Sequence, residues 1–578
     1  MKRILYIVLF ISWAVSVLAV PARRGWQTRM QPDGLTIEIQ VVGDEYYHYT
    51  VNRAGECVRE NENGFFELVG PAPTEEQARI RRAQGVARRQ REHDFGTTPN
   101  LAPKGIVILA NFADLKFDEE HTQAVFDELC NAEHCTVNTY EDVQYPSAAE
   151  YFSSQSNGTY RPQFDVFGPV TLSHEYAYYG KDKSKEGDDQ YAATAVVEAC
   201  ILANEQYSDL DFANYDSDND GDVDFVYVIY AGLGQADGGD ANTIWPHNWT
   251  VTKAIKRGYC TYNSNQRILD EKRVENYAMS AELSREGLGG IGTLCHEFGH
   301  VMGLPDLYDT NYGVNYDDYL TPNDWDVMDQ GAYGGDGHCP PNYDPWEKYF
   351  FGWVTPVNLG NSSQQVTLGA NGTKDYNVYQ INASGELKGA TTAGLSFYIE
   401  NRQQQGWDTY LPGHGLVIWK VDFNASDWQN NTPNNTANKP RFTIVSAYGT
   451  QIASKANGVN NPFPGGMNVT SWSGLENKPL MNIVEADEVI SLLYMINPEM
   501  HLVQWMANGE LVALQAYPKD GSGELHAPSQ TFEPCAGTTF IGWTANPDWC
   551  DPFEDPDDLF TDSNGKVTQS ITYYALFE

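Results

Sequence analysis

The sequence predicts a multidomain α+β protein: a small β domain, a larger α/β domain, an all-β sandwich and a small C-terminal β module. Residues 35–51 alternate apolar and polar side chains around turn residues, which is typical of short strands. Residues 103–356 mix apolar strand-like runs with helical patterns. Residues 357–495 show repeated β runs between Asn, Gly and Pro loops. A chain of 578 residues is long enough for three or four domains.

Residues 1–19 have the pattern of a secretory signal peptide. Met1-Lys2-Arg3 precedes an apolar stretch that ends in Val17-Leu18-Ala19, a suitable cleavage sequence. The stretch is shorter than the roughly 20 residues that a membrane-spanning helix needs. We therefore expect a secreted protein, extracellular or at the cell surface, with no membrane span.

Residues 20–102 are expected to hold the small β domain and a basic segment. Six arginines fall within a short stretch of this acidic protein: Arg79, Arg81, Arg82, Arg88, Arg89 and Arg91. A solvated basic helix would explain them, but exposed linkers are where proteolytic nicking concentrates. The sequence favours a protease-sensitive linker to the next domain.

Residues 103–356 are expected to form the α/β domain. Strands are predicted at 105–112, 164–170 and 225–230, and helices at 146–153 and 190–207. The glycine-rich run at 231–239 is not a phosphate loop, because no Gly-Lys-Ser/Thr follows it.

One stretch of this domain carries the chemistry. His296 and His300 are four residues apart, so a helix places both on one face, where neutral imidazoles suit zinc. Glu297 between them is placed to act as a general base. Gly303 can adopt the positive φ that ends a helix, which would bring Asp306 back as a third ligand. Three protein ligands and one open position are typical of catalytic zinc.

A methionine turn strengthens this prediction. WDVMD at 325–329 follows the helix at the distance at which metzincin peptidases carry a methionine below the metal. Another zinc clan would use a distant glutamate as third ligand, and Glu347 is then a candidate. Tyr333 is a candidate for stabilising the oxyanion, whereas packing is favoured for His247. Peptide is expected to bind along a strand edge, at 227–230 or 277–280.

A second acidic motif predicts calcium. Aspartates at alternate positions with a glycine in sixth place match the start of an EF-hand loop: Asp216, Asp218, Asp220, Asp222 and Asp224. Tyr227 stands in the twelfth place, where a full hand has glutamate, so the loop would lead directly into a strand. A solvated acidic turn is the weaker alternative, because the carboxylates would repel one another.

Nine cysteines in a secreted chain permit disulfides and leave one unpaired. Two local pairs are plausible, Cys130 with Cys135 and Cys535 with Cys550. Cys295 is expected to be a small buried hydrophobe. Cys57 is a disfavoured candidate for a thiolate that blocks the zinc.

The motifs resemble immune inhibitor A-type secreted metalloproteases. The resemblance rests on HEFGHVMGLPDLYD at 296–309, WDVMD at 325–329 and PWEKYFFGW at 345–353, with weaker similarity upstream and downstream. It implies a metzincin-like zinc peptidase domain over 103–356, with Asp306 in the third zinc position. It also implies that residues 20–102 include a pro-segment, so that the protein is made as a zymogen.

The expected function is hydrolysis of peptide bonds in extracellular proteins, with Zn²⁺ and Ca²⁺ as cofactors. The formal net charge of −41 argues against nucleic acid and anionic membranes as partners. The alternative is a catalytically silent protein that binds a surface or glycan on a peptidase-like scaffold. Residues 496–578 resemble the repeats of internalin B-type surface proteins, so the C-terminal β domains are expected to contact a surface or glycan. A monomer is expected.

Overall fold

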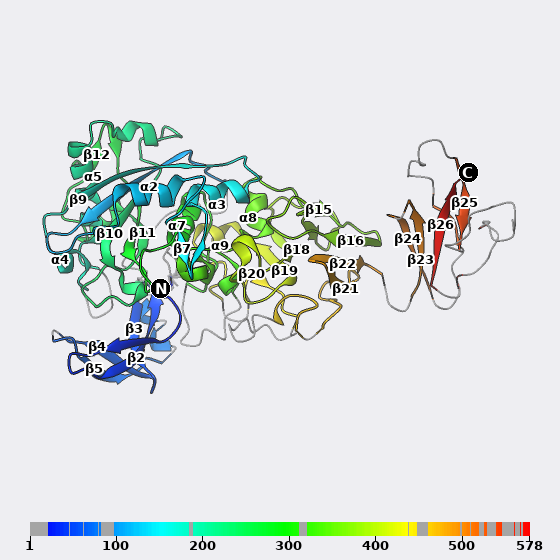
Figure 1. Cartoon of the computed structure of the whole chain (residues 1–578), viewed down its shortest axis with the longest axis horizontal. Helices are drawn as coiled ribbons and strands as arrows, with labels where there is room; N and C mark the ends of the chain where they lie inside the picture. The colour runs from blue at the N-terminus through cyan, green and yellow to red at the C-terminus, as the bar shows by residue number, and fades with distance from the viewer. Residues whose placement is uncertain are drawn as a thin grey trace, which may run out of the picture.

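The computed structural model is shown in Figure 1. It describes residues 21–577 except for 45–46, 83–97, 184–188, 311–320, 437–438, 448–459, 497–499, 519–524, 529–538, 546–559, 561–566, 568–569 and the single positions 62, 75, 79, 467 and 509. The signal-peptide prediction and most of the basic segment therefore lie outside the described residues. Among the described residues, no helix combines the length and the apolar character needed to cross a membrane. The predicted multidomain α+β class is confirmed.

The N-terminal domain is a single antiparallel sheet in sequential order. Its strands are β1 (Gln27–Met30), β2 (Thr36–Asp44), β3 (Tyr47–Asn52), β4 (Glu56–Glu60) and β5 (Phe66–Pro71). The alternating pattern at 35–51 thus forms β2 and β3, as predicted. The start of the basic segment is anchored here: the buried guanidinium of Arg82 pairs with Asp44 at 2.6 Å. Arg82 is therefore neither solvated nor part of a free linker.

The central domain is built on a five-stranded sheet in the order β11-β14-β10-β6-β9. The strands are β6 (Lys104–Asn111), β9 (Gln163–Thr171), β10 (Val226–Leu233), β11 (His247–Thr250) and β14 (Asn276–Leu283). All neighbours are parallel except β11, which pairs antiparallel with β14. The expected peptide-binding edge at 227–230 or 277–280 is wrong, because β10 and β14 are interior strands with partners on both sides. The edge strand next to β14 is β11.

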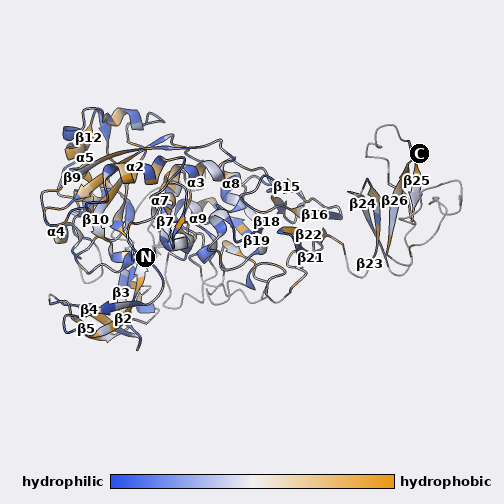
Figure 2. Cartoon of the chain, in the orientation of Figure 1, coloured by the Kyte–Doolittle hydropathy of each residue, from blue (hydrophilic) through white to orange (hydrophobic). Residues whose placement is uncertain are grey.

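Helices flank this sheet. They are α2 (Gln123–Asn131), α3 (Ala148–Gln155), α4 (Tyr176–Gly180), α5 (Ala192–Gln206), α6 (Val251–Arg257), α7 (Gly292–Val301) and α8 (Pro345–Phe350). Short elements complete the domain: β7 (Thr139–Tyr140), β8 (Val143–Gln144), β12 (Ile268–Leu269), β13 (Lys272–Arg273), η1 (Phe212–Tyr215), η2 (Gln235–Asp237), η3 (Asn323–Trp325) and η4 (Gln330–Gly337). Figure 2 shows hydrophobic residues running through β9, α2 and α5, which belong to one large core.

A β sandwich follows and shares that core. One sheet holds β15 (Val357–Asn358), β17 (Tyr379–Ile381), β18 (Gly394–Arg402), β19 (Gly415–Phe423) and β20 (Phe442–Ile444), with η5 (Gly406–Asp408) between strands. The other sheet holds β16 (Gln364–Leu368), β22 (Val489–Tyr494) and β21 (Leu480–Ala486). The two sheets enclose a second core. The outer face of the first sheet packs on the central domain, where Trp346 of α8 contacts Trp428 and Phe442.

One expectation for this region is wrong. No helix is expected after Trp353, yet α9 (Ala425–Gln429) forms there. The Asn424 side chain accepts a hydrogen bond from the Asp427 N–H and caps the helix, and Trp428 buries its apolar face. The short helix positions the loop that follows it.

The C-terminal module is a four-stranded sheet in the order β24-β23-β26-β25. Its strands are β23 (Met500–Ala507), β24 (Glu510–Pro518), β25 (Phe540–Thr544) and β26 (Ile571–Phe577). Trp505 and Trp543 pack at its centre. In Figure 1 the module and the N-terminal sheet lie at opposite ends of the long axis.

The predicted pairing of Cys130 with Cys135 is wrong, because both thiols are free. Cys130 lies on α2 with its side chain in the central core, and burial raises the pKa of both thiols. The Cys135 sulfur instead accepts hydrogen bonds from the backbone N–H groups of Asn138 and Val137. The Cys535 and Cys550 pair lies outside the described residues.

Candidate functional site

The site is organised by helix α7 and the turn that ends it. Gly299 lets the chain below approach closely, because a Cβ there would lie 2.7 Å from the Met328 sulfur. The helix ends at Val301, and Gly303 adopts φ = +103°, the left-handed conformation predicted for the turn. A Cβ at Gly303 would also lie 3.2 Å from the Thr98 carbonyl oxygen.

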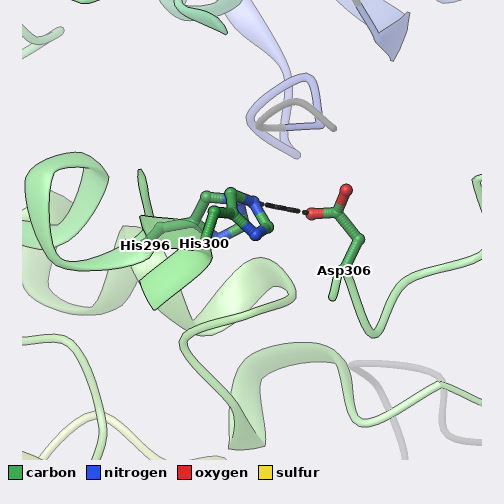
Figure 3. Close-up of side chains that lie close together, drawn as sticks. All are labelled: His296, His300 and Asp306. Carbon is green, nitrogen blue, oxygen red and sulfur yellow. Dashed lines mark hydrogen bonds and ion pairs between the residues drawn. The ribbon is translucent and has the colours of Figure 1, made fainter. Parts of the chain in front are cut away.

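The helix and the turn bring three predicted ligands together. The Nε2 atoms of His296 and His300 are 3.1 Å apart, and Asp306 Oδ1 lies 3.4 Å from each. Figure 3 shows both imidazoles on the helix facing the carboxylate from the following segment. All three side chains are fully buried.

Backbone carbonyls set the direction of both imidazoles. The Nδ1–H of His296 donates to the Val327 carbonyl at 2.8 Å, and that of His300 donates to the Leu304 carbonyl at 2.8 Å. In the neutral imidazoles, these bonds leave both Nε2 atoms as acceptors that face each other. Two acceptors at this distance repel each other unless a proton or a metal cation lies between them.

The charges at the site act on one another. Burial disfavours charge on His296, but the hydrogen bond and charge of Asp306 and the charge of Glu297 raise the pKa of His296 to about 9. Burial also opposes ionisation of Asp306, but the neighbouring histidines bring the pKa of Asp306 to about 2. The carboxylate is therefore ionised, and it favours positive charge between the three groups.

The spacing fits zinc. Tetrahedral zinc with bonds of about 2.0–2.1 Å needs donor atoms about 3.3 Å apart. The three donor separations of 3.1, 3.4 and 3.4 Å lie close to this value. Nitrogen and carboxylate oxygen donors are those that zinc accepts.

The rival ligand Glu347 lies elsewhere. Its carboxylate belongs to a separate buried group with Asp326 and Asp344, whereas Asp306 belongs to the histidine group. Met328 lies beneath α7, and its carbonyl accepts a hydrogen bond from the Leu307 N–H at 2.9 Å. The turn at 325–329 thus supports both the helix and the strand-like segment that carries Asp306.

Asn431 holds Asp306, the predicted third ligand, and the sequence analysis missed this contact. Its side-chain oxygen accepts from the Asp306 N–H at 2.6 Å, and its side-chain nitrogen donates to Asp306 Oδ2 at 2.6 Å. This leaves Asp306 Oδ1 directed at the histidines. The only signal in the sequence is the Asn-rich run 424–435 itself, and nothing in that run indicates its distant partner.

The other candidate residues have different surroundings. Glu297 is fully buried on α7 next to His296. Burial raises the pKa of Tyr333 well above its ordinary value, and the charge of Glu297 adds to this shift. The Tyr333 hydroxyl donates to the Pro21 carbonyl at 2.8 Å. His247 is buried in β11, where its ring contacts the Trp245 carbonyl at 2.7 Å and the Tyr277 hydroxyl at 3.0 Å, in agreement with a packing role.

The N-terminal segment from Pro21 to Arg24, which we call the arm, lies against the site. The Arg23 guanidinium forms ion pairs with Asp336 and Asp237, and Arg285 donates to the arm's Arg23 and Arg24 carbonyls. Arg23 and Arg24 line a cavity of about 300 Å³ together with Tyr333 and Asp336. A pale blue N-terminal ribbon crosses the close-up of the ligands in Figure 3. Cys57 lies in β4 of the N-terminal sheet.

The acidic loop gathers part of the predicted calcium ligands. Carboxylate oxygens of Asp216, Asp218 and Asp220 lie within 4.8 Å of one another. The Asp222 side chain points away from these carboxylates and forms an ion pair with Arg273. The Asp224 side chain accepts a hydrogen bond from the Ser217 N–H at 2.9 Å. An EF-hand takes only a backbone carbonyl from its seventh position, so the direction of the Asp222 side chain agrees with that pattern. Lys272 Nζ lies 2.6 Å from Asp216.

Comparison with known proteins supports the family resemblance that the sequence motifs indicated for the central domain. Residues 102–355 match the family described as "Immune inhibitor A peptidase M6, catalytic domain". The chain is 25% identical over 324 residues to Immune inhibitor A of Bacillus thuringiensis subsp. alesti, covering 49% of this chain and 45% of that protein. It is 25% identical over 284 residues to Pre-pro-metalloprotease PrtV of Vibrio cholerae serotype O1 (strain M66-2), covering 43% and 29%. The chain thus spans less than half the length of either relative.

Proposed function

We propose that this chain is a secreted zinc-dependent endopeptidase acting on extracellular proteins, because residues 102–355 match the immune inhibitor A peptidase M6 catalytic domain. The observation that carries the proposal is the set of three buried donors within 3.4 Å of one another on α7 and its turn. His296, His300 and Asp306 would hold zinc, which supplies a Lewis acid at this position when bound.

Glu297 is the proposed general base. It follows His296 on the same helix, and its charge acts on the His296 imidazole, so its carboxylate lies near the proposed metal ligands. It accepts a proton from the water that attacks the peptide carbonyl and returns that proton to the leaving amine. Tyr333 is a candidate to donate a hydrogen bond to the oxyanion, because its hydroxyl donates to a peptide carbonyl, that of Pro21.

Glu297→Gln tests the proposal in the processed protein with casein as substrate. We expect one zinc per chain to remain bound and turnover to fall by at least about 100-fold. Glu198→Gln is the matched control, because Glu198 is a buried glutamate of the same domain that bonds Tyr179 and Ser173 outside the site. If Glu297→Gln and the wild type cleave casein equally, the enzyme proposal is wrong and the silent binding protein is favoured.

We infer further that residues 20–102 include a pro-segment that holds the enzyme latent. The contacts of the arm support this: its Pro21 carbonyl occupies the Tyr333 hydroxyl, and its Arg23 fills an acidic recess at Asp336. Ala22 packs against Trp245, which precedes the edge strand β11. Removal of the arm would free these groups for a substrate.

Latency is tested by comparing the unprocessed chain with its processed form. N-terminal sequencing of the secreted enzyme is expected to give a terminus within residues 79–102. Arg23→Ala should raise the activity of the unprocessed chain, whereas Arg53→Ala, which breaks an exposed pair with Glu38 in the same domain, should not. Equal activity of the unprocessed and processed wild type would contradict the proposal.

We also propose that the loop at 216–224 binds calcium. Three of its carboxylates already face one another, and hard oxygen donors at this spacing suit Ca²⁺. Calcium would have to displace the Lys272 ammonium from Asp216. This proposal is tested by titrating the wild type and Asp218→Asn with calcium in an isothermal calorimeter. The heat of calcium binding at the loop should be absent from the variant.

A further inference from the structure

A second group of carboxylates lies within the core, away from the histidines. Asp326 belongs to the segment between η3 and η4, whereas Asp344 and Glu347 lie at the start of α8. One oxygen of each lies within 4.8 Å of an oxygen of the other two. All three residues have no exposed surface.

Each of these carboxylates uses one oxygen for the backbone and leaves the other without a donor. Asp326 Oδ1 accepts from the Met328 N–H, Asp344 Oδ1 from the Trp346 and Glu347 N–H groups, and Glu347 Oε2 from the Asp344 N–H. The second oxygens, Asp326 Oδ2, Asp344 Oδ2 and Glu347 Oε1, are buried and accept no hydrogen bond from a donor in the described part of the chain. The Asp326 and Asp344 carboxyl groups also lie within hydrogen-bond reach of each other, so they must share either a proton or a cation. A buried polar atom without a partner is costly and calls for an unseen ligand.

The surrounding charges do not neutralise this group. Arg402 donates to Glu400 Oε1 at 3.1 Å and to both oxygens of Asp408. The buried Lys348 donates to Asn371, which in turn donates to Glu400. These two cations therefore offset two other carboxylates. No basic side chain among the described residues forms an ion pair with Asp326, Asp344 or Glu347. Burial and the neighbouring carboxylates raise the pKa of Asp344 and of Glu347 well above their ordinary values, so full ionisation of the group needs a bound cation.

We propose that Asp326, Asp344 and Glu347 bind one hard divalent cation, and that this cation is calcium. Carboxylate oxygens are the donors that Ca²⁺ prefers, at 2.3–2.6 Å, so oxygens on opposite sides of the ion lie about 4.6–5.2 Å apart. One oxygen of each carboxylate lies within 4.8 Å of the other two, so a single ion between them could contact all three. Soft or imidazole donors, which zinc prefers, are absent from the three.

The cation would connect two structural elements below the zinc site. Asp326 directly precedes Val327, whose carbonyl accepts the Nδ1–H bond of His296. Asp344 and Glu347 belong to α8, which packs into the central core through Trp346. The ion therefore fixes the turn at 325–329 against α8 and, through Val327, fixes the direction of a zinc ligand.

The experiment counts calcium in the full chain by mass spectrometry after dialysis against micromolar free calcium. The acidic loop is disabled in both samples by Asp218→Asn with Asp220→Asn, so that its calcium does not contribute. Glu347→Gln is then added to one sample, because it removes one charge without changing the side-chain shape. We expect the loop-disabled chain to hold at least one calcium and the sample with Glu347→Gln to hold one fewer.

Thermal melting distinguishes a cation from protons shared among the carboxylates. With a cation, the loop-disabled chain melts higher in calcium, and Glu347→Gln loses that shift. With shared protons, Glu347→Gln leaves the calcium count unchanged and melts higher than its parent, which overturns the proposal. Should Glu347→Gln fail to fold, the loop-disabled chain decides alone: no bound calcium and no shift in melting temperature overturn the proposal.

Discussion

Asn431 offers a direct test of how a distant loop controls the metal site. It lies in the loop after α9, yet it binds both the N–H and the carboxylate Oδ2 of Asp306. Its backbone has φ = +56°, so alanine there would add strain of its own. Asn431→Gly removes the side chain and keeps this conformation accessible.

The expected loss follows from these two bonds. The bond to the charged carboxylate contributes about 1.5–3 kcal/mol and the bond from the backbone about 0.5–1.5 kcal/mol. Part of this appears as lower stability, and part appears as a metal ligand that is no longer held in place. Loss of such an outer partner typically lowers metal affinity about 10–100-fold, which corresponds to about 1.4–2.7 kcal/mol.

The assay is competition for zinc between the protein and a coloured chelator at fixed pH. Peptidase activity against free zinc concentration gives a second measurement, and its midpoint should shift by the same factor while activity at saturating zinc recovers. Asn157→Gly is the matched control, because Asn157 is exposed with φ = +53° and lies outside the site. The control carries the same gain in backbone flexibility without loss of a ligand contact.

The reasoning is refuted if Asn431→Gly binds zinc within about threefold of Asn157→Gly, since a threefold change is less than about 1 kcal/mol. Asn431→Asp gives an independent check at nearly constant shape. It places a second carboxylate against Asp306 Oδ2 and should weaken zinc binding further than glycine does, unless the loop moves away.

Three further predictions concern the turn, the pro-segment and the calcium loop. Gly303→Ala should lower the free energy of unfolding by at least about 1–2 kcal/mol, because a residue with a side chain is strained at φ = +103°. The added Cβ would also lie 3.2 Å from the Thr98 carbonyl oxygen. An unchanged midpoint of urea unfolding would contradict this prediction. Arg82→Met removes the 2.6 Å ion pair between two buried side chains, Arg82 and Asp44, at a cost of about 3–5 kcal/mol. Limited proteolysis should then cut the N-terminal sheet faster than in the wild type, and equal rates would count against the pair. Lys272→Met should tighten calcium binding at the loop, because calcium then no longer competes with the Lys272 ammonium for Asp216. Weaker calcium binding in a calorimetric titration would contradict this and would indicate that Lys272 stabilises the loop.

Local sequence was sufficient for the parts of the site that a helix determines. The spacing of His296 and His300 predicts their shared face, and Gly303 predicts the turn, because both follow from the geometry of a few consecutive residues. The donor separations around Asp306 agree with that prediction. The same is true of β2, whose side chains alternate between more buried and less buried positions along most of the strand.

Contacts between distant segments were not predictable in this way. The edge position of β11 is set by the order of the strands in the sheet, and this order depends on pairing between segments far apart in the sequence. The shared core of the central domain and the sandwich depends on the aromatic faces of Trp346, Trp428 and Phe442 meeting in space. Neither leaves a periodic pattern in the sequence.

What the sequence determined by itself is the proposed donor set: two imidazoles, one carboxylate and a candidate base within eleven residues of chain. Only the tertiary structure decided how those donors are held, through Asn431, 125 residues from Asp306, and through Val327 below His296. It also decided that Glu347 lies with Asp326 and Asp344 instead of the histidines. The physical reason is that residue spacing constrains neighbours on one helix, whereas partners far apart in sequence are chosen by the packing of the whole core.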